Sequence, residues 1–355
     1  MYSVIMAGGV GKRFWPRSRK DRPKQLLNIV DDSSMLRLTV DRLHRKSEYS
    51  EIFIVTNRLQ AEIIKQEIPE IPEENLLLEP AGKNTAPAIA LSAIHILNID
   101  EDAVMAVFPA DHLIMKEDQF FTDLDKAVEA VKAKNCLVTF GIEPTRPATG
   151  YGYIQYDTKK MLVEDKVYKV KTFAEKPNLN TARRFLNSGD FLWNSGMFVW
   201  KAKTILQQMK AFMPELHDSA MRIQEALETE NYQRVLDREW KTLRSESIDY
   251  GIMEKAGNVY VVRSEFFWSD LGSWASVYDI SEKDEQENVI EGEALMVESK
   301  GNYVYSPKRF VASVGLEDMI IINTDEITLV VERNKAEEVK KLVDKLEKNH
   351  LKDYL

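Results

Sequence analysis

The first 140 residues alternate short apolar runs with longer amphipathic stretches. The apolar runs, which we predict to be β-strands, are residues 3–6, 52–55, 76–78, 104–108 and 137–140. The amphipathic stretches, which we predict to be helices, are residues 35–44, 59–68, 87–97 and 120–132. Strands that alternate with helices in this way form a mostly parallel sheet with helices on both faces. We therefore expect an α/β fold that binds its ligands at the carboxyl ends of the strands.

The later part of the chain has a different pattern. Residues 151–156, 167–173 and 259–262 read as further strands, and residues 201–254 are rich in helical patterns. From about residue 288 to 333, short β-branched runs are split by Gly, Asn, Asp and Pro, which predicts either a few hairpins or a short β-solenoid. Residues 334–349 read as an amphipathic helix whose many Lys and Glu side chains form a solvated face. We expect two domains, residues 1–285 and residues 286–355.

Charge and composition exclude several classes of protein. The net charge of −9 argues against a nucleic-acid partner, since such proteins present a basic face. No apolar run approaches the length that crosses a bilayer, so we expect no membrane partner. The first residues lack the features of a signal peptide, which predicts a cytoplasmic protein. The single cysteine, Cys136, excludes an internal disulfide.

A glycine-rich loop follows the first predicted strand. Gly8, Gly9 and Gly11 follow Ala7 and allow the backbone to point several N–H groups at an anion. Arg13 offers a planar fork for phosphate oxygens, and Lys24 offers a compact charge. The pattern is neither a Walker loop, because Arg13 follows Lys12, nor a dinucleotide fingerprint, because Phe14 stands at the third glycine position. The loop from Gly8 to Lys24 is therefore predicted to grip phosphate groups.

Gly-Gly-x-Gly-x-Arg followed by Pro-Lys resembles the signature of the sugar-1-phosphate nucleotidyltransferases. The resemblance extends, in the same order, through about three-quarters of the chain, and its later motifs resemble the mannose-1-phosphate guanylyltransferase branch. These motifs are residues 79–80, 83–88, 109–112, 175–177, 194–198 and 268–274. One departure is Arg17, because many members carry leucine after the proline at position 16. The segment from Arg17 to Arg22 is more basic as a result.

The resemblance implies the reaction of GTP with α-D-mannose 1-phosphate, which gives GDP-mannose and pyrophosphate by in-line attack on the α-phosphorus. It also implies Mg²⁺ as cofactor, a Rossmann-like sheet, a small left-handed β-helix at the carboxyl end, and a homodimer. Two alternatives stay open: a transferase for another nucleoside triphosphate or hexose 1-phosphate, and a regulatory protein that binds a sugar nucleotide without catalysis. The retention of Lys24, Asp111 and Asp270 speaks against the regulatory alternative.

Two anions must meet in this reaction, so positioning and charge neutralisation dominate its catalysis. Asp111 follows an apolar strand, and Asp270 lies in an aromatic loop. Carboxylates are the ligands that Mg²⁺ prefers, and the resemblance assigns both residues as metal ligands. A turn or helix-capping role is the alternative for each. The residues that we predict to be catalytic are Arg13, Lys24, Asp111, Lys176 and Asp270; His112 is given no role.

The resemblance divides the other site residues into two groups. The predicted nucleotide-binding residues are Ala7, Gly8, Gly9, Gly11, Glu79, Pro80, Lys83, Asn84, Thr85 and Pro109. Thr85 could also cap the helix that we expect to begin near Ala86. The predicted sugar-phosphate-binding residues are Gly150, Tyr151, Gly152, Glu175, Lys176, Asn194 and Asp249. An exposed Glu175–Lys176 pair and a helix-capping Asp249 are the structural alternatives.

Overall fold

The computed structural model describes residues 1–9, 11–163 and 166–355, and these form two compact units that do not follow the order of the sequence. The sheet unit consists of Met1–Gly8, Thr39–Ala110 and Ile114–Trp268. The C-terminal unit consists of Gly9–Leu38, Asp111–Leu113 and Ser269–Leu355. The predicted phosphate loop is thus divided, since Gly8 lies in the sheet unit whereas Gly9, Gly11 and Lys24 lie in the C-terminal unit. Val10 is outside the described residues.

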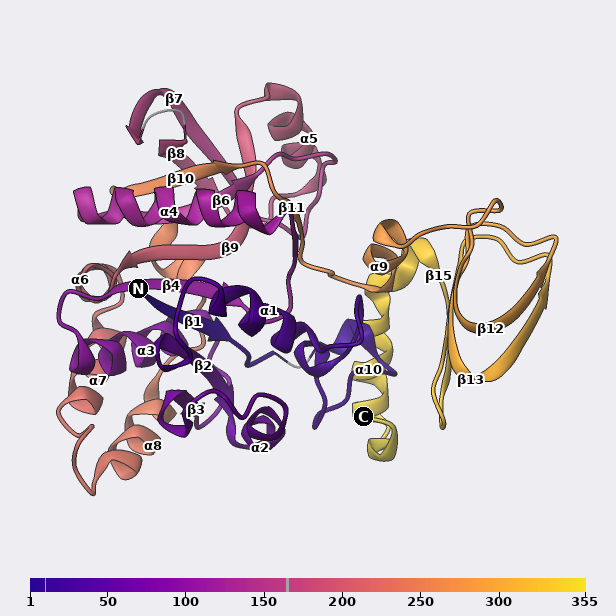
Figure 1. The fold of residues 1–355 in the computed structure, drawn as a ribbon, viewed down its shortest axis with the longest axis horizontal. Helices are drawn as coiled ribbons and strands as arrows, with labels where there is room; N and C mark the ends of the chain where they lie inside the picture. Colours follow the sequence, from indigo (N-terminus) through magenta and orange to yellow (C-terminus); the bar gives the residue numbers. More distant parts are fainter. Residues whose placement is uncertain (10, 164–165) are drawn as a thin grey trace. The chain divides into compact units, whose positions relative to one another are not determined.

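The sheet unit is built on a nine-stranded sheet in the order β3-β2-β1-β4-β9-β6-β10-β8-β7 (Figure 1). The strands are β1 (Tyr2–Met6), β2 (Ile52–Asn57), β3 (Leu76–Glu79), β4 (Val104–Pro109), β6 (Leu137–Ile142), β7 (Tyr153–Val163), β8 (Val167–Ala174), β9 (Phe191–Lys201) and β10 (Val259–Ser264). Strands β3, β2, β1 and β4 are parallel, and β9 enters antiparallel between β4 and β6. The predicted α/β fold is confirmed, and the antiparallel pairings made by β9, β8 and β7 make the sheet mixed.

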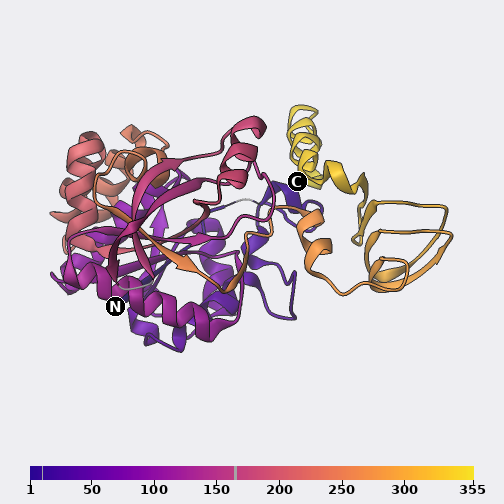
Figure 2. The same cartoon turned by 90° about the horizontal axis from the view of Figure 1, so that it is seen from above.

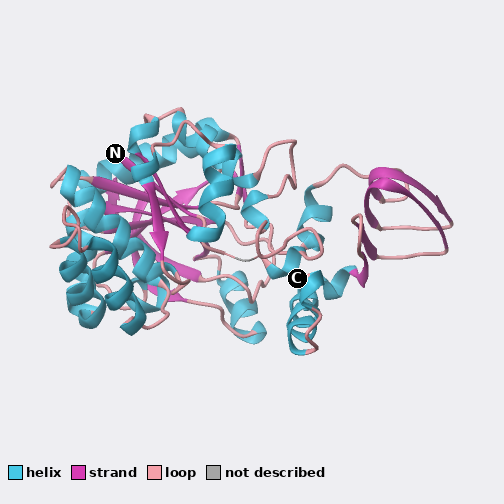
Figure 3. Ribbon diagram, turned by 90° about the horizontal axis from the view of Figure 1, so that it is seen from below, coloured by secondary structure: helices cyan, strands magenta, loops and turns pink. Residues whose placement is uncertain are grey.

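Helices cover both faces of this sheet (Figure 3). They are α2 (Arg58–Glu67), α3 (Thr85–Ile99), α4 (Glu117–Ala133), α5 (Leu179–Ser188), α6 (Ala202–Phe212), α7 (Pro214–Gln224) and α8 (Tyr232–Thr242). Helix α3 buries ten of its residues, which explains why apolar side chains surround it rather than forming one stripe. It packs between the sheet and the helices α6 and α7, and it anchors the loop that follows β3.

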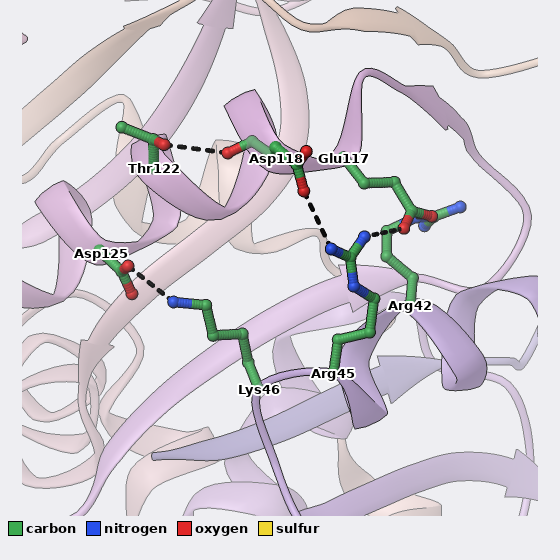
Figure 4. Close-up of polar contacts among 7 residues, drawn as sticks. All are labelled: Arg42, Arg45, Lys46, Glu117, Asp118, Thr122 and Asp125. Atoms are coloured by element: carbon green, nitrogen blue, oxygen red, sulfur yellow. Dashed lines mark hydrogen bonds and ion pairs between the residues drawn. The ribbon is translucent and has the colours of Figure 1, made fainter.

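Ion pairs join the end of α1 (Met35–His44) to the start of α4 (Figure 4). Arg42 Nε lies 3.2 Å from one oxygen of Glu117, and Arg45 Nη1 lies 2.7 Å from the other. A second nitrogen of Arg45 lies 2.9 Å from Asp118 Oδ1. The cations stand at the carboxyl end of one helix and the carboxylates in the first turn of the other, so each group also has a favourable interaction with its own helix dipole.

The C-terminal unit contains a separate four-stranded sheet. Its strands are β12 (Val289–Val297), β13 (Tyr303–Val314), β14 (Met319–Asn323) and β15 (Thr328–Glu332). Strands β12, β13 and β14 pair in parallel, and β15 returns antiparallel to β14. In Figure 2 the chain of this region winds in successive coils of similar outline. Parallel stacking decides in favour of the solenoid over a series of hairpins, and among β12 to β15 only β14 and β15 form a hairpin.

The core of the C-terminal unit joins the start of the chain to its end. Phe14, Trp15 and Leu27 are buried together with Trp274, of α9 (Trp274–Ile280), and Val343, of α10 (Val339–Lys348). The rings of Phe14 and Trp274 lie 4.8 Å apart, and Trp274 Nε1 donates a hydrogen bond of 3.3 Å to the carbonyl of Trp15. The predicted phosphate loop is therefore held by residues that follow it by about 250 to 330 positions.

Candidate active site

The loop from Gly11 to Lys24 folds back on itself in the C-terminal unit. Gly11 has φ +65° and precedes a short 3-10 helix, η1 (Lys12–Phe14). A Cβ atom at position 11 would lie 2.6 Å from Lys24 Cβ and 2.8 Å from Lys24 N. The glycine is therefore required both by the left-handed backbone and by the close approach of Lys24. Ser18 Oγ closes the turn by donating to the carbonyl of Gly11 over 2.7 Å.

Lys24 joins the two predicted metal ligands. Its ammonium donates to Asp111 Oδ2 over 2.9 Å and to the carbonyl of Asp270 over 2.6 Å. Only 6% of the Lys24 side chain is exposed, against 32% for Asp111. Burial by itself raises the pKa of Asp111, but the charges of Lys24 and His112 and the hydrogen bond from Lys24 outweigh it, so the pKa of this carboxyl is lowered. Asp111 is consequently ionised at neutral pH.

These groups line a cavity of about 340 Å³ that lies entirely within the C-terminal unit. Its lining residues are Gly11, Lys12, Arg13, Phe14, Lys24, Asp111, His112, Asp270, Leu271, Gly272 and Lys340. Leu271 has φ +42°, and a Cβ atom at Gly272 would lie 3.1 Å from Asp270 Oδ2. The backbone at positions 271 and 272 thus lets the Asp270 carboxylate fold over the turn. The structure brings together the predicted residues Arg13, Lys24, Asp111 and Asp270.

Helix α10 contributes to this cavity, which the sequence interpretation did not foresee. Lys340 lines it, and Lys12 Nζ lies 2.9 Å from Asp344 and 3.1 Å from Glu347. The hydrogen bond that Lys12 donates to Asp344 is the main cause of the raised pKa of Lys12. The expectation that the charges of this helix form only a solvated face is therefore wrong. A Lys/Glu-rich helix contains no local signal that separates a cavity-lining lysine from its solvated neighbours.

The donor set of the cavity fits a hard divalent cation. In the described ranges, no group of three or more His, Cys, Asp or Glu side chains is placed to hold a metal ion. The cavity offers two carboxylates, Asp111 and Asp270. Mg²⁺ is commonly bound through one or two carboxylates, with phosphate oxygens and water as the other ligands. An ionised Asp111 supplies a ligand in the protonation state that such binding requires.

A second group of predicted residues lies at the carboxyl ends of the parallel strands of the sheet unit. Glu79 ends β3, and a Cβ atom at Gly8 would lie 3.1 Å from its Oε2. Burial raises the pKa of Glu79 to about 7. Its Oε1 is buried and has no hydrogen-bond partner among the described residues. A buried acceptor without a partner is costly, so this carboxyl is poised for a donor from a ligand. Pro109 pairs with Met6 at the same edge of the sheet.

The loop after β3 is held by the segment that follows α8. Lys83 Nζ donates to the carbonyl of Leu243 over 2.6 Å, which fixes this ammonium within the sheet unit. Asn84, with φ +69°, caps α3 through its side chain, which accepts from Thr85 N over 2.9 Å. Thr85 Oγ1 instead accepts from Ile248 N over 2.9 Å. The suggestion that Thr85 caps the helix is therefore wrong, because the helix begins one residue earlier than expected.

Several of the residues predicted to bind the sugar phosphate lie around Asn194. This residue lies in β9, opposite Gly141 of β6, and its Nδ2 donates to Asp249 Oδ1 over 2.9 Å. Thr139 Oγ1 donates to Asn194 Oδ1 over 2.9 Å, which fixes the orientation of the amide. Asp249 begins a π-helix, η5 (Asp249–Met253). Burial, followed by the negative charge of Glu175, raises the pKa of Asp249 to about 7, although Asn194 and Lys176 oppose the shift.

The side chain of Glu175 can lie close to Asn194 because Gly152, which lies beside both, has no side chain. A Cβ atom at position 152 would lie 2.3 Å from Glu175 Oε2 and 3.3 Å from Asn194 Cβ, whereas one at Gly150 would meet nothing within 4 Å. Lys176 Nζ pairs with Glu175 Oε1 over 2.8 Å, with 58% of the lysine side chain exposed against 9% for Glu175. The pair is therefore only half exposed. Tyr151 packs edge-on against Trp193 and Trp268.

Comparison with known proteins shows the family to which the chain belongs. The model of the family described as "Nucleotidyl transferase" matches residues 2–287, which is most of the chain.

This chain belongs to the nucleotidyl transferase family.

A second family model, described as "MannoseP isomerase/GMP-like beta-helix domain", matches residues 292–346 of this nucleotidyl transferase. It agrees with the parallel stacking of β12, β13 and β14 and confirms the expected β-helix-like region.

Curated relatives and solved structures place the chain within the family. A mannose-1-phosphate guanylyltransferase of Escherichia coli is 36% identical over 99% of this chain and 76% of its own length. RfbM, the mannose-1-phosphate guanylyltransferase of Salmonella typhimurium, is 38% identical over 99% of this chain and 73% of its own. A crystal structure described as a mannose-1-phosphate geranyltransferase from Thermus thermophilus is 31% identical, with a TM-score of 0.88 and coverage of 98% and 99%. These matches confirm the resemblance to the guanylyltransferase branch.

Within the described ranges, no helix of this nucleotidyl transferase combines the length and the apolar character needed to span a bilayer.

Proposed function

We propose that this nucleotidyl transferase transfers GMP from GTP to α-D-mannose 1-phosphate, with GDP-mannose and pyrophosphate as products. The observation that carries the proposal is the cavity in which Arg13 and Lys24 stand beside the carboxylates of Asp111 and Asp270. Cations together with oxygen ligands for a metal suit the transfer of a phosphoryl group between two anions. The guanylyltransferase names of relatives that match 99% of this chain support the choice of GTP and mannose.

In the proposed reaction, the cavity holds the triphosphate. Asp111 and Asp270 would hold Mg²⁺, which when bound neutralises phosphate charge and acts as a Lewis acid. Arg13 and Lys24 add positive charge around the same phosphates, and Lys340 supplies a further cation from the cavity wall. An oxygen of the sugar phosphate attacks the α-phosphorus of GTP in line. The bond from the α-phosphorus to the bridging oxygen breaks, and pyrophosphate leaves with that bond's electron pair, so that no covalent enzyme intermediate forms.

Glu79 is the proposed reader of the base. Guanine presents two donors on one edge, N1–H and the N2 amine, and an ionised carboxylate accepts from both. The buried Oε1 of Glu79, which has no protein partner within the described part of the chain, has the acceptor capacity for one of these donors. Adenine and uracil lack this pair of donors, so the residue would favour GTP over ATP and UTP.

The sugar phosphate is the proposed ligand of the group around Asn194. Glu175, Asn194 and Asp249 offer carboxyl and amide groups that suit sugar hydroxyls. Lys176, which is more than half exposed, supplies the cation for the phosphate of the nucleophile. We further propose that the protein is a cytoplasmic homodimer, and sedimentation of the full chain at several concentrations tests the oligomeric state.

Pyrophosphate release tests the substrate choice. The full chain is assayed with Mg²⁺ against GTP, ATP, UTP and dTTP, each combined with the 1-phosphates of mannose, glucose and galactose. We expect release with GTP and mannose 1-phosphate to exceed every other combination by at least about tenfold. A preference for UTP or dTTP would replace the proposed substrates by others of the same class. The absence of release in every combination, with sugar-nucleotide binding retained, would instead support a regulatory protein.

A further inference from the structure

The basic segment from Arg17 to Arg22, which lies within the predicted phosphate loop, faces a second cavity in the C-terminal unit. This cavity has a volume of about 420 Å³ and shares no lining residue with the cavity of Asp111 and Asp270. Five cationic side chains line it: Arg17, Arg19, Arg22, Lys308 and Arg309. Three of them belong to the segment from Arg17 to Arg22, and two belong to β13. The proposed reaction uses none of these residues.

Three of the five cations are held by acceptors that carry no negative charge. Arg17 Nη2 donates to the carbonyl and the side-chain oxygen of Asn28, over 2.7 and 2.6 Å. Arg22 Nε donates to the carbonyl of Leu26 over 3.2 Å. Arg309 Nη2 donates to the carbonyl of Asp325. These bonds orient the guanidinium groups but leave their charge in place.

Two carboxylates offset the remaining pair of cations. Lys308 Nζ lies 2.6 Å from Asp325 Oδ2, and Arg19 Nη2 lies 3.2 Å from Glu326 Oε2. Five cations and two carboxylates leave an excess of three positive charges on the wall of the cavity. The whole chain has a net charge of −9, so this local excess runs against the charge of the protein. Concentrated cations in a concave site raise the local concentration of anions.

Arg17 gives the cavity a rigid wall and an unused donor. Its guanidinium carbon lies 4.1 Å from the centre of the Tyr305 ring, and stacking of this kind fixes the plane of the group. Its Nη1 is buried and has no hydrogen-bond partner among the described residues. An apolar side chain such as leucine could supply neither the charge nor the donor. The stacked guanidinium and its buried donor therefore both suit the binding of an anion in this cavity.

We propose that this cavity is a second anion site, which binds a small molecule bearing a diphosphate group. Two linked phosphoryl groups match an excess of three positive charges, and the volume lies in the range of small-ligand pockets. The segment that binds the ligand is part of the predicted phosphate loop, and Ser18 Oγ ties it to the start of that loop by donating a hydrogen bond to the carbonyl of Gly11. Binding at the second site therefore restrains the loop that carries Arg13 and Lys24. The inference does not depend on which base or sugar the enzyme accepts.

Calorimetric titration of the full chain without divalent cations tests the proposal, with inorganic pyrophosphate and GDP as separate probes. We expect two binding events per chain for the probe that the site prefers. Arg13→Gln weakens the event at the catalytic cavity. Lys308→Gln combined with Arg309→Gln weakens the other event by about tenfold or more, because charge-assisted hydrogen bonds to phosphate are lost. Arg17→Gln has the same effect on that event, and a thermal scan shows whether this variant is folded.

Lys300→Gln is the matched control. Lys300 is 67% exposed and pairs with one carboxylate, Glu287, as Lys308 is 70% exposed and pairs with Asp325, yet Lys300 does not line the cavity. A second event that is unchanged in Lys300→Gln and weakened in Lys308→Gln/Arg309→Gln supports the site. If the second event occurs with pyrophosphate and not with GDP, the ligand is the inorganic ion. If it occurs with GDP and not with pyrophosphate, the ligand is a nucleotide. The proposal is overturned if both probes give a single binding event per chain. It is also overturned if the second event has the same affinity in Lys300→Gln as in Lys308→Gln/Arg309→Gln.

Discussion

The carboxyl groups of the two units stand in opposite electrostatic surroundings. In the C-terminal unit, Asp111 has a lowered pKa because Lys24 and His112 outweigh the effect of its burial. In the sheet unit, burial raises the pKa of Glu79 and of Asp249 to about 7, and Glu175 adds to the shift at Asp249. The same chemical group is therefore held charged in one unit and close to half-protonated at neutral pH in the other.

This difference separates two kinds of recognition. A cluster of lysine, arginine and ionised aspartate suits a ligand whose binding is dominated by charge, as a triphosphate with its metal ion is. A buried carboxyl with few charged neighbours suits hydrogen bonds to neutral groups, such as a base edge or sugar hydroxyls. Substitutions in the C-terminal unit should therefore alter turnover and salt dependence, whereas those in the sheet unit should alter substrate preference and pH dependence.

The largest expected effect comes from removing a charge at Asp111 or Asp270. Asp111→Asn and Asp270→Asn should each lower pyrophosphate release by about 10²-fold or more, because an amide cannot replace the charge of a metal-binding carboxylate. Both variants should stay folded, as shown by thermal unfolding. Asp31→Asn, an exposed residue of the same unit that does not line the cavity, is the control. Near-normal release in both variants would remove the metal assignment.

Gly152→Ala should weaken the binding of the sugar phosphate. The added Cβ atom would lie 2.3 Å from Glu175 Oε2, so the flexible carboxylate must swing away from Asn194 and Asp249. We expect the KM for the sugar phosphate to rise by about 10- to 100-fold with little change in melting temperature, because the displaced group lies at the end of a side chain. Gly150→Ala, whose Cβ atom meets nothing within 4 Å, is the matched control. Equal KM values for the two variants would contradict the placement of Glu175 in the sugar site.

Glu79→Gln should weaken the preference for GTP over ITP, which lacks the 2-amino group, by about tenfold. The wild-type kcat/KM for GTP should rise as the pH increases through about 7, since the carboxylate accepts two donors only after it loses its proton. The variant should lose this rise. Glu74→Gln, an exposed residue that precedes the same strand, serves as the control. A pH profile that Glu79→Gln leaves unchanged would separate Glu79 from base recognition.

Asp249→Asn should change the pH dependence of stability. The folded state raises the pKa of Asp249 from 3.8 to about 7, so the folded protein binds this proton more tightly than the unfolded chain does. The contribution of this proton to the free energy of unfolding is fully present below pH 4 and is lost as the pH rises to about 7. The free energy of unfolding then falls by at most about 1.4 kcal/mol per pH unit. Urea unfolding at pH 5, 6 and 7 should show a flatter profile in the variant. In Asp102→Asn, where the side chain is 84% exposed, the wild-type slope should persist.

Lys340→Gln should have the smallest effect. Loss of one cation from the cavity wall should raise the KM for GTP by about threefold at low salt, and the difference should shrink as added salt screens the charge. Lys341→Gln is the neighbouring control, since Lys341 is 72% exposed and pairs with Glu338. Identical KM values for the two variants would show that helix α10 does not take part in binding the triphosphate.

Local patterns predicted the elements that depend on local physics. Residues 35–44 were expected to be a helix and form α1 with the same bounds, and the expected helix 120–132 lies within α4. Strand β9 was missed, because the polar sequence Asn194-Ser195-Gly196 interrupts its apolar pattern. Its antiparallel position between β4 and β6 depends on pairing with residues far away in the sequence. No periodicity within one segment reports such pairing.

The candidate site shows the same division. Motif residues such as Arg13, Lys24, Asp111 and Asp270 were identified from their order in the chain, and the structure places them around one cavity. Lys340 and the ion pairs of Lys12 were not foreseen, because nothing within helix α10 marks one of its lysines. The pKa values of Glu79 and Asp249 were also out of reach, since they depend on burial and on neighbours brought in by the fold.

The sequence by itself determined the alternation of strands and helices, the glycines that a phosphate loop needs, and the order of the motifs that mark the family. Only the tertiary structure decided that Gly9–Leu38 folds with the carboxyl-terminal part of the chain rather than with the sheet to which the preceding strand, β1, belongs. Phe14, Trp15 and Leu27 are buried against Trp274 and Val343 there. The physical reason is that hydrophobic burial has no direction, so an apolar side chain in a loop does not specify which distant surface will cover it.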